Sequence, residues 1–398
     1  MRRRSLWPVA AISAAVVGLP VNVAKAAAPL RPEACRSIAV SPSYKVDHTL
    51  LCAANASGTS FFLYKSKDSG HTWTKQTVSV VNASTFVNAT AIYPADDFAT
   101  SGRVYLENGA GVFGPSPLDS SAYIPYSQAG GGSPVDFDFT QVKGVAPLYG
   151  SFFVAQETRN YRVDLPASQP LTGTGTDYTE HFLAAPGDDG PRYALAMTDY
   201  PGVSGKGQPA LYGCAAAGAC VQKPQTFGLA KYIASYLGPT TSTGDTVVVQ
   251  TEATAQYRPA YPGALLSIST DSGKTMRPWY GLMKALAPMI KRASAQAESL
   301  SRVGVAWDPR NAKRVLVRAG WFGEDQILRS DDGGKTFRVV NSRLPWGARD
   351  LLVTPEKGGR RLVMTSDGML LTLSGPDSNG RSGLFCSRDL GASWRPTC

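Results

Sequence analysis

The sequence has few metal-ligating side chains, and they are not arranged as a metal site requires. Only three histidines occur (His48, His71 and His181), and no two of the six cysteines have C-x-x-C spacing. Zinc sites in proteins draw their ligands from clustered cysteine and histidine residues. We therefore expect no metal and no cofactor.

The chain also lacks a long apolar run after its first 26 residues, which excludes a later membrane-spanning helix. Those first residues place three arginines (Arg2 to Arg4) before an apolar run and small residues around Ala24 to Ala26. That order is typical of an export signal. We expect residues 1–26 to be a cleaved signal peptide and residues 27–398 to form a single domain. The mature protein should be secreted or associated with the cell wall, without stable membrane insertion.

A recognised nucleic-acid motif is missing too, although the net charge is +10. Three of the positive charges lie in the predicted signal, and the rest are dispersed along the chain. Dispersed positive charge favours weak attraction to anionic surfaces or polysaccharides and does not indicate a nucleic-acid partner. We expect a monomer.

Six cysteines suit an exported protein, because disulfides persist outside the cytoplasm. Six residues allow 15 pairings, and sequence alone does not choose among them. Cys214 and Cys220 bracket the short stretch AAAGA, so we expect them to close a hairpin. Proximity along the chain suggests two further pairs, Cys35 with Cys52 and Cys386 with Cys398.

One short pattern recurs four times, as Ser-x-Asp-x-Gly-x-Thr/Ser followed by an aromatic residue or, once, by methionine. The copies, called Ser–Asp turns below, are Ser66–Trp73, Ser269–Met276, Ser330–Phe337 and Ser387–Trp394. An aspartate can bond nearby backbone N–H groups, a glycine suits positive φ, and the aromatic ring offers apolar area. We expect each copy to tie off a β-hairpin. The residues with these structural roles are Asp68, Gly70, Trp73, Asp271, Gly273, Asp332, Gly334, Phe337, Asp389, Gly391 and Trp394.

Short apolar or alternating runs, separated by polar segments with Gly or Pro, flank each Ser–Asp turn, and this pattern predicts strands. Units of four such runs predict an all-β fold, a β-propeller of four-stranded antiparallel blades. The units begin near Arg36, Thr90, Asp136, Arg192, Tyr232, Arg302 and Arg349. This parse favours seven blades, with six or eight as alternatives.

The Ser–Asp turns are identified as Asp-boxes, and the chain resembles the sialidase-like (BNR-repeat) β-propeller superfamily. The resemblance implies that the boxes lie between the third and fourth strands of a blade. It also implies that they lie on the face away from any active site, and that their aspartates are structural.

One segment, residues 279–302, breaks the strand pattern. Its apolar residues recur in steps of three and four, which predicts a helix that Pro288 should kink or split. We favour a helix that caps one edge of the blades. The alternative is a wall or lid beside a binding face, on the face opposite the Ser–Asp turns.

Function is expected on that opposite face, in loops between second and third strands. The loops gather aromatic, acidic and arginine side chains in three late blades, a mixture that suits sugar binding, although any one of them could be a solvated loop residue. The ligand-binding candidates are Tyr257, Arg258, Tyr261, Trp321 and Asp367. Glu107 and Glu157 occupy comparable loops in the early blades.

Catalysis by glycoside hydrolysis usually needs two positioned carboxylates, and Glu252 with Glu324 or Asp325 could supply them. The sialidase pattern also needs an Arg-Ile-Pro motif, which this chain lacks. Our first hypothesis is therefore non-catalytic recognition of a glycan or extracellular protein. The alternative is a glycoside hydrolase or polysaccharide lyase that uses those carboxylates.

Overall fold

The computed structural model describes most of the chain in segments. These are residues 32, 35–56, 60–80, 91–94, 98–107, 111–115, 122–128, 137–141, 151–155, 160–164, 167–170, 178–184, 192–198, 208–214, 220–223, 231–252, 266–292, 302–321, 324–342, 362–374, 383–396 and 398. The predicted signal peptide, residues 1–26, lies outside them.

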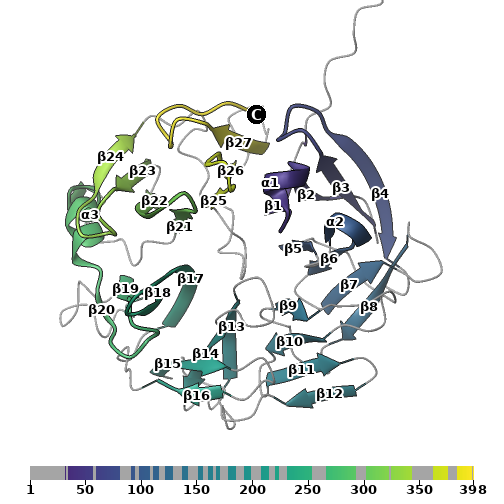
Figure 1. Cartoon of the computed structure of the whole chain (residues 1–398), viewed down its shortest axis with the longest axis horizontal. Coiled ribbons are helices and arrows are strands. Elements are labelled where there is room, and N and C mark those ends of the chain that lie inside the picture. The colour runs from purple at the N-terminus through teal and green to yellow at the C-terminus, as the bar shows by residue number, and fades with distance from the viewer. Residues whose placement is uncertain are drawn as a thin grey trace, which may run out of the picture.

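The described strands are arranged as a ring of small sheets, the architecture of a β-propeller (Figure 1). Consecutive strands pair antiparallel within successive groups, which we number as blades 1 to 7; a parallel pair, β4 with β8, joins blades 1 and 2 into one eight-stranded sheet. The blade total for the whole chain stays a prediction. Blade 1 comprises β1 (Cys35–Val40), β2 (Leu50–Asn55), β3 (Ser60–Ser66) and β4 (Thr74–Val80), and blade 2 comprises β5 (Ala91–Pro94), β6 (Val104–Glu107), β7 (Gly111–Pro115) and β8 (Ala122–Gln128).

The next two blades follow the same pattern. Blade 3 comprises β9 (Phe137–Gln141), β10 (Ser151–Ala155), β11 (Asn160–Asp164) and β12 (Ala167–Pro170), and blade 4 comprises β13 (Tyr178–Ala184), β14 (Arg192–Thr198), β15 (Gln208–Cys214) and β16 (Cys220–Gln222). Arg192, expected to open a unit, instead begins the second strand of blade 4. Cys214 and Cys220 are cross-strand partners in the β15–β16 hairpin, as their predicted pairing requires.

The last three blades carry three of the four Ser–Asp turns. Blade 5 comprises β17 (Lys231–Thr241), β18 (Gly244–Glu252), β19 (Leu266–Ser269) and β20 (Arg277–Pro278). Blade 6 comprises β21 (Arg302–Asp308), β22 (Asn311–Trp321), β23 (Glu324–Ser330) and β24 (Arg338–Asn341). Blade 7 comprises β25 (Leu362–Met364), β26 (Leu370–Ser374) and β27 (Gly383–Ser387). A bridge between Cys386 and Arg395 stands where a fourth strand of blade 7 would pair.

The hydrophobic clusters formed by the described residues lie between neighbouring blades. Blades 5 and 6, for example, enclose a buried cluster that includes Val248, Leu266 and Val317. The ring closes in the same way, because β1 packs against β26 and β27. The cluster at this seam contains Leu50 and Tyr64 from blade 1 together with Leu371 and Leu384 from blade 7.

In the described segments, three helices accompany the strands: α1 (Tyr44–Asp47), α2 (Phe98–Ser101) and α3 (Tyr280–Arg292). α3 lies at the outer edge of the disc (Figure 1) and buries Leu282 and Leu286 in the cluster between blades 5 and 6. This arrangement matches the predicted edge cap. Pro288 does not split the helix, which runs on to Arg292.

The start of α3 differs from the expectation that the insertion rises from the face opposite the Ser–Asp turns. Trp279, immediately before the helix, donates its indole N–H to the Gly334 carbonyl at 2.8 Å. Gly334 belongs to the Ser–Asp turn of blade 6, so the helix begins on the turn side of the disc. Arg302, predicted to end the insertion, is the first residue of β21.

Two disulfides join described residues, Cys35 to Cys52 and Cys386 to Cys398. Both pairs confirm the prediction from proximity. Disulfides are typical of proteins outside the cytoplasm. Within the described ranges no helix is both long and apolar enough to cross a membrane.

Candidate functional site

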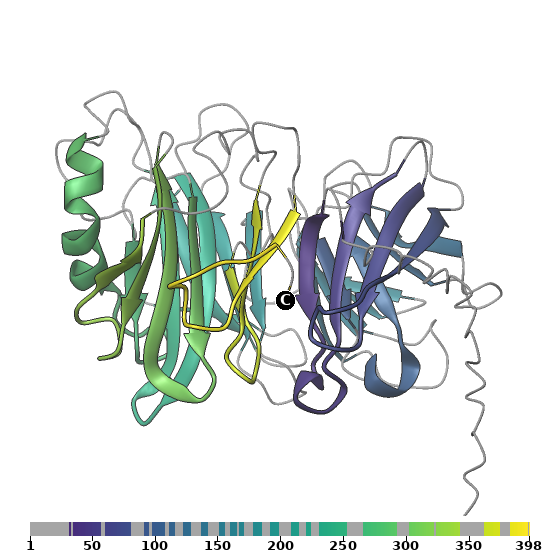
Figure 2. The same ribbon diagram turned by 90° about the horizontal axis from the view of Figure 1, so that it is seen from above.

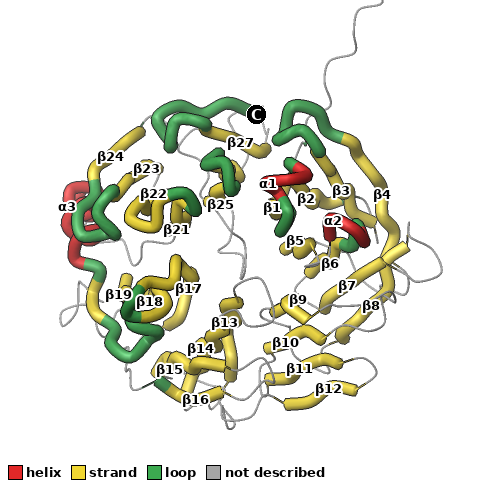
Figure 3. Tube along the Cα trace, in the orientation of Figure 1, coloured by secondary structure: helices red, strands yellow, loops and turns green. Residues whose placement is uncertain are grey.

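The four Ser–Asp turns each follow the third strand of a blade. They join β3 to β4, β19 to β20 and β23 to β24, and the fourth joins β27 to the bridge at Arg395. Figure 3 shows them as green loops beside the strands that they join, and in Figure 2 the described turns lie along the lower edge of the disc. This position confirms the predicted topology of the turns.

Four hydrogen bonds recur in all four Ser–Asp turns. The serine hydroxyl donates to one carboxylate oxygen of the aspartate at 2.7 Å and accepts the glycine N–H at 2.7–2.8 Å. The residue two positions after the glycine, threonine or serine, donates its N–H at 2.8–3.0 Å and its hydroxyl at 2.5–2.6 Å to the carboxylate. Each aspartate is therefore occupied by its own turn.

The pKa values of these aspartates reflect that occupation. Burial alone would raise the pKa of Asp68, Asp271 and Asp389, but donated hydrogen bonds outweigh it, so the pKa of each carboxyl lies below its usual value. Donation from the Thr336 hydroxyl is the largest effect on Asp332 and, with further donors, lowers its pKa to about 2. A carboxylate held ionised and saturated with donors is poorly suited to general acid catalysis.

The aromatic position of the turn supplies a further bond. Trp73 and Trp394 each donate the indole N–H to the glycine carbonyl of their own turn, Gly70 and Gly391, at 3.0 Å. Phe337 has no such donor, and the carbonyl of Gly334 accepts its bond from Trp279 of the preceding blade instead. The rings of Trp279 and Phe337 also meet edge to face, with centroids 5.4 Å apart.

The turn glycines lie where neighbouring blades touch. All four have positive φ, and a Cβ at any of them would lie within 2.7 Å of a side-chain atom of the blade that precedes it around the ring. Those neighbours are Cys398 for Gly70, Leu211 for Gly273, Trp279 for Gly334 and Ile327 for Gly391. The Ser–Asp turns therefore connect adjacent blades, and the first of them acts at the seam between blades 7 and 1.

The strand ends far from the turns carry four of the predicted site residues: Glu252, Trp321, Glu324 and, one position inside its strand, Asp325. Glu252 is the last residue of β18, whose first residues contact the turn of blade 5: the Asp245 N–H donates to Ser272 Oγ at 2.9 Å. In blade 6, Trp321 ends β22 and Glu324 begins β23, which runs on to the turn at Ser330. At about 3.3 Å per residue, seven strand residues separate Glu324 from that turn by roughly 20 Å.

Trp321, Glu324 and Asp325 were expected in a loop and instead belong to strands. Trp321 is the cross-strand partner of Glu324, and Gly320 is the partner of Asp325. Only two residues lie between Trp321 and Glu324 in the chain, so no long loop carries them. Tyr257, Arg258 and Tyr261 lie outside the described residues, as does Glu157; Glu107 ends β6.

Asp367 was predicted on the face opposite the turns, and that placement is wrong. It lies between β25 and β26, where Thr365 donates its hydroxyl to the Asp367 carboxylate and its N–H to the carbonyl of Met369. Arg310, in the β21–β22 turn of blade 6, donates Nη1 to the Asp367 carbonyl at 2.5 Å. First-to-second-strand turns and third-to-fourth-strand turns lie at the same end of a meandering blade, so Asp367 is on the side of the Ser–Asp turns.

Sequence reasoning missed a network of charged side chains on this same side. Asp308, with a side chain 0% exposed, accepts from Arg310 Nε at 2.9 Å and from Arg314 Nη1 at 3.0 Å. Burial would raise the pKa of Asp308, but the hydrogen bonds from Arg310 and Arg314 lower it to about 2. The sequence signal was one aspartate followed closely by three basic residues in DPRNAKR, residues 308–314.

Among the described residues, no three His, Cys, Asp or Glu side chains lie close enough together to hold a metal ion.

Comparisons with known proteins support the architecture. No protein-family model matches the chain, and neither does any curated protein sequence. A puromycin-hydrolysing peptidase of Mycobacterium tuberculosis is similar with a TM-score of 0.55 and 11% identity, over 92% of this chain and 52% of that one. The BP39L lectin of Burkholderia pseudomallei gives a TM-score of 0.51 and 12% identity, over 92% and 99% of the two chains.

YCF48 of Cyanidioschyzon merolae gives a TM-score of 0.49 and 12% identity, over 90% of this chain and 96% of that one. Identities this low relate folds and not activities. Together with the radial, four-stranded antiparallel sheets, the similarity to the peptidase and the lectin shows that this chain has a β-propeller fold.

Proposed function

We propose that the protein is an exported Asp-box propeller that recognises a glycan or an extracellular protein through the face opposite the Ser–Asp turns. The observation that carries the proposal is the pairing of Trp321 with Glu324 at the strand ends farthest from the turn of blade 6. This pairing brings an aromatic and an acidic residue together on that face, and such mixtures suit sugar recognition because rings stack on sugars while carboxylates accept from hydroxyls.

The hydrogen bonds and contacts of the Ser–Asp turns support a structural role for the turns and a ligand site on the opposite face. Their aspartates accept donors from their own turns, and their glycines are in contact with the preceding blade. The Ser–Asp turns thereby hold neighbouring blades together, and we infer that the glycan or protein ligand binds at the opposite strand ends and their connections. A β-propeller of similar fold is a lectin, so the scaffold is compatible with sugar binding.

The test is a glycan array and a reducing-sugar release assay on the mature protein, with the W321A/E324A double variant beside the wild type. We expect array binding that the double variant loses by about tenfold or more, with the melting temperature within a few degrees, as for surface changes. The control variant Y280A/K284A changes two exposed positions at the outer edge and should bind as the wild type does.

Release of reducing ends by the wild type would replace this proposal with the hydrolase hypothesis, in which Glu252 acts with Glu324 or Asp325. Equal binding by W321A/E324A and the wild type would refute the proposed site.

A further inference from the structure

The turn side of blade 6 carries a convergence of guanidinium groups. Arg314 Nε lies 2.9 Å, Arg329 Nη2 2.8 Å and Arg338 Nη2 3.8 Å from oxygens of the Asp331 carboxylate. The Asp331 side chain is 41% exposed, so this meeting point is open to solvent. One carboxylate balances only one of the three cations that surround it.

The convergence extends into the blade through Arg314. Its second nitrogen contacts Asp308, which is fully buried and also holds Arg310. Asp308 therefore orients two guanidinium groups from beneath, while Arg310 Nη1 reaches the Asp367 carbonyl of blade 7. Because a planar guanidinium fixed at one edge presents its remaining N–H groups in known directions, the network is preorganised for bidentate binding of oxyanions.

Positive charge is in excess throughout this region, which we call the arginine patch. It comprises Arg310, Lys313, Arg314, Arg329, Lys335 and Arg338, against the carboxylates of Asp308, Asp331, Asp332 and, beside Arg310, Asp367. Asp332 is occupied by donors of its own turn. Lys313, Lys335 and Arg338 are exposed, Arg338 to 69%, so these three positive charges face solvent.

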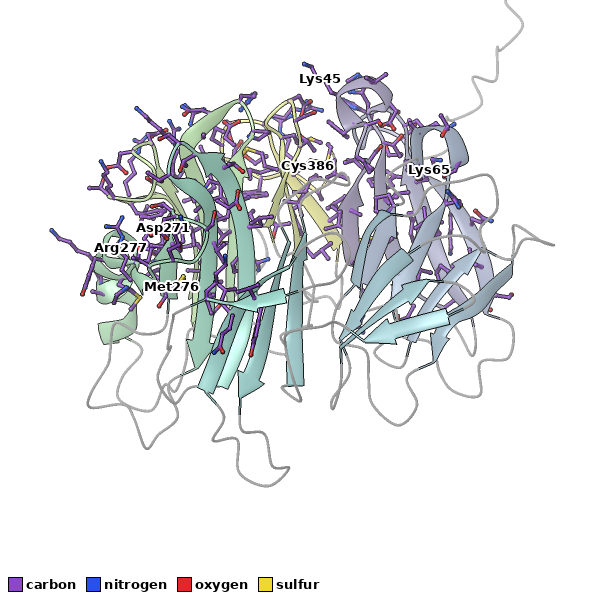
Figure 4. The ribbon with its side chains drawn as sticks, turned by 60° about the horizontal axis from the view of Figure 1, so that its bottom comes forward. Lys45, Lys65, Asp271, Met276, Arg277 and Cys386 are labelled. Atoms are coloured by element: carbon purple, nitrogen blue, oxygen red, sulfur yellow. A yellow bond between two sulfur atoms is a disulfide. The ribbon has the colours of Figure 1, made fainter. Side chains whose placement is uncertain are left out.

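The shape of the arginine patch indicates an extended ligand. Its residues come from the β21–β22 and β23–β24 turns and from β22, β23 and β24, which lie side by side in one sheet. Neighbouring strands are about 4.8 Å apart, so the patch extends over roughly 10 Å across the blade. That distance exceeds a single phosphate and fits successive groups of a chain. The other described cations on this side, such as Lys45 (Figure 4), lie on different blades.

We propose that the arginine patch is a second binding surface, which docks a linear polyanion whose repeating groups are phosphates. Arginine is the preferred partner for phosphate where bidentate geometry matters, and the patch offers several such groups in sequence. This surface lies on the side opposite the one in the proposed function and does not depend on it. It would hold the propeller to an anionic polymer while the other face stays free.

The test titrates fluorescently labelled inorganic polyphosphate with the mature protein, following anisotropy at several salt concentrations. The patch variant K313Q/K335Q/R338Q removes three exposed cations and leaves the buried Asp308 network intact. The control K45Q/K67Q/K284Q removes three exposed cations from blade 1 and α3, so the two variants have the same net charge.

We expect the patch variant to bind polyphosphate about tenfold more weakly and its log–log salt slope to fall by about 2, since each phosphate contact contributes about 0.7 on a single-stranded polyanion. The control should stay within about twofold of the wild type. Equal weakening of the two variants would overturn the proposal in favour of general charge attraction. So would binding to vesicles of phosphatidylglycerol and phosphatidylcholine in the absence of polyphosphate binding, because that result identifies a lipid surface.

Discussion

Replacing Gly334 with alanine should destabilise the protein more than the same change at its neighbour Gly333. Both glycines have positive φ, 85° and 77°. They differ in their surroundings: a Cβ at Gly333 has no heavy atom within 4 Å, whereas a Cβ at Gly334 would lie 2.6 Å from the indole nitrogen of Trp279. The pair separates the cost of backbone conformation from the cost of contact between blades 5 and 6.

The expected magnitudes follow from these two terms. Positive φ costs an alanine about 1–2 kcal/mol, and the lower entropy of the unfolded chain returns about 0.4–1 kcal/mol. G333A should therefore lose about 1 kcal/mol. G334A adds overpacking against a ring that is 2% exposed, typically about 1–3 kcal/mol, for a total of about 2–4 kcal/mol.

Urea unfolding followed by far-ultraviolet circular dichroism measures both variants. A further pair, W279F and W279F/G334A, completes a double-mutant cycle, because phenylalanine removes the indole nitrogen and shortens the ring. The extra cost of G334A should then fall by about 1 kcal/mol or more, as for residues in contact. Equal losses for G333A and G334A, or strict additivity in the cycle, would refute the role of this turn as a contact between blades.

Three further outcomes are expected. D332A should lose about 1–3 kcal/mol in the same assay, because Ser330 and Thr336 lose their acceptor, while glycan binding by the folded fraction stays unchanged; a normal unfolding midpoint with lost glycan binding would place the glycan site on the turn side. The pKa values of Asp308 and Asp332 are lowered to about 2 from an ordinary 3.8, so these groups contribute stability that is fully present above pH 3.8 and is lost as the pH falls through about 2. The melting temperature of the wild type should therefore drop steeply in that pH window, and that of D308N less steeply. The same slope in the wild type and D308N would contradict the assignment. C386S/C398S should lose about 2–3 kcal/mol, as for a closed loop of this size, since it frees Cys398 from Gly70; no change in the unfolding midpoint would show that this link contributes nothing at the seam.

The turns were predictable because their chemistry is local. Serine, aspartate, glycine and threonine lie within eight residues of one another, so their spacing encodes the hydrogen bonds directly. The partners across the ring were not predictable in this way. Nothing in the sequence links Gly334 to Trp279 or Gly70 to Cys398, because such contacts depend on how successive blades are stacked.

The wrong placement of Asp367 has a definite cause. The prediction placed Asp367 in a loop between the second and third strands of blade 7, whereas the apolar run that follows it forms β26, the second strand of that blade. Asp367 and Gly368, with φ of 87°, form a tight turn before β26. An Asp-Gly pair between apolar runs is a strong hairpin signal, and giving it more weight would have moved Asp367 to the correct side. The network around Asp308 was missed because charged turn residues are usually solvated, and burial is a tertiary property.

Blades 1 and 2 are joined at both their outer and their inner strands. Their outermost strands pair in parallel, Ser79 with Ala122 and Val80 with Tyr123, while their innermost strands β1 and β5 also touch. Residues of both blades, from β2 to β6, share one apolar cluster, which includes Phe61, Ile92 and Leu106. A unit closed at both edges should open as a single foldon. In hydrogen exchange, the amides of β2, β3 and β6 should share one opening free energy, and partial opening of the ring should occur first at other seams.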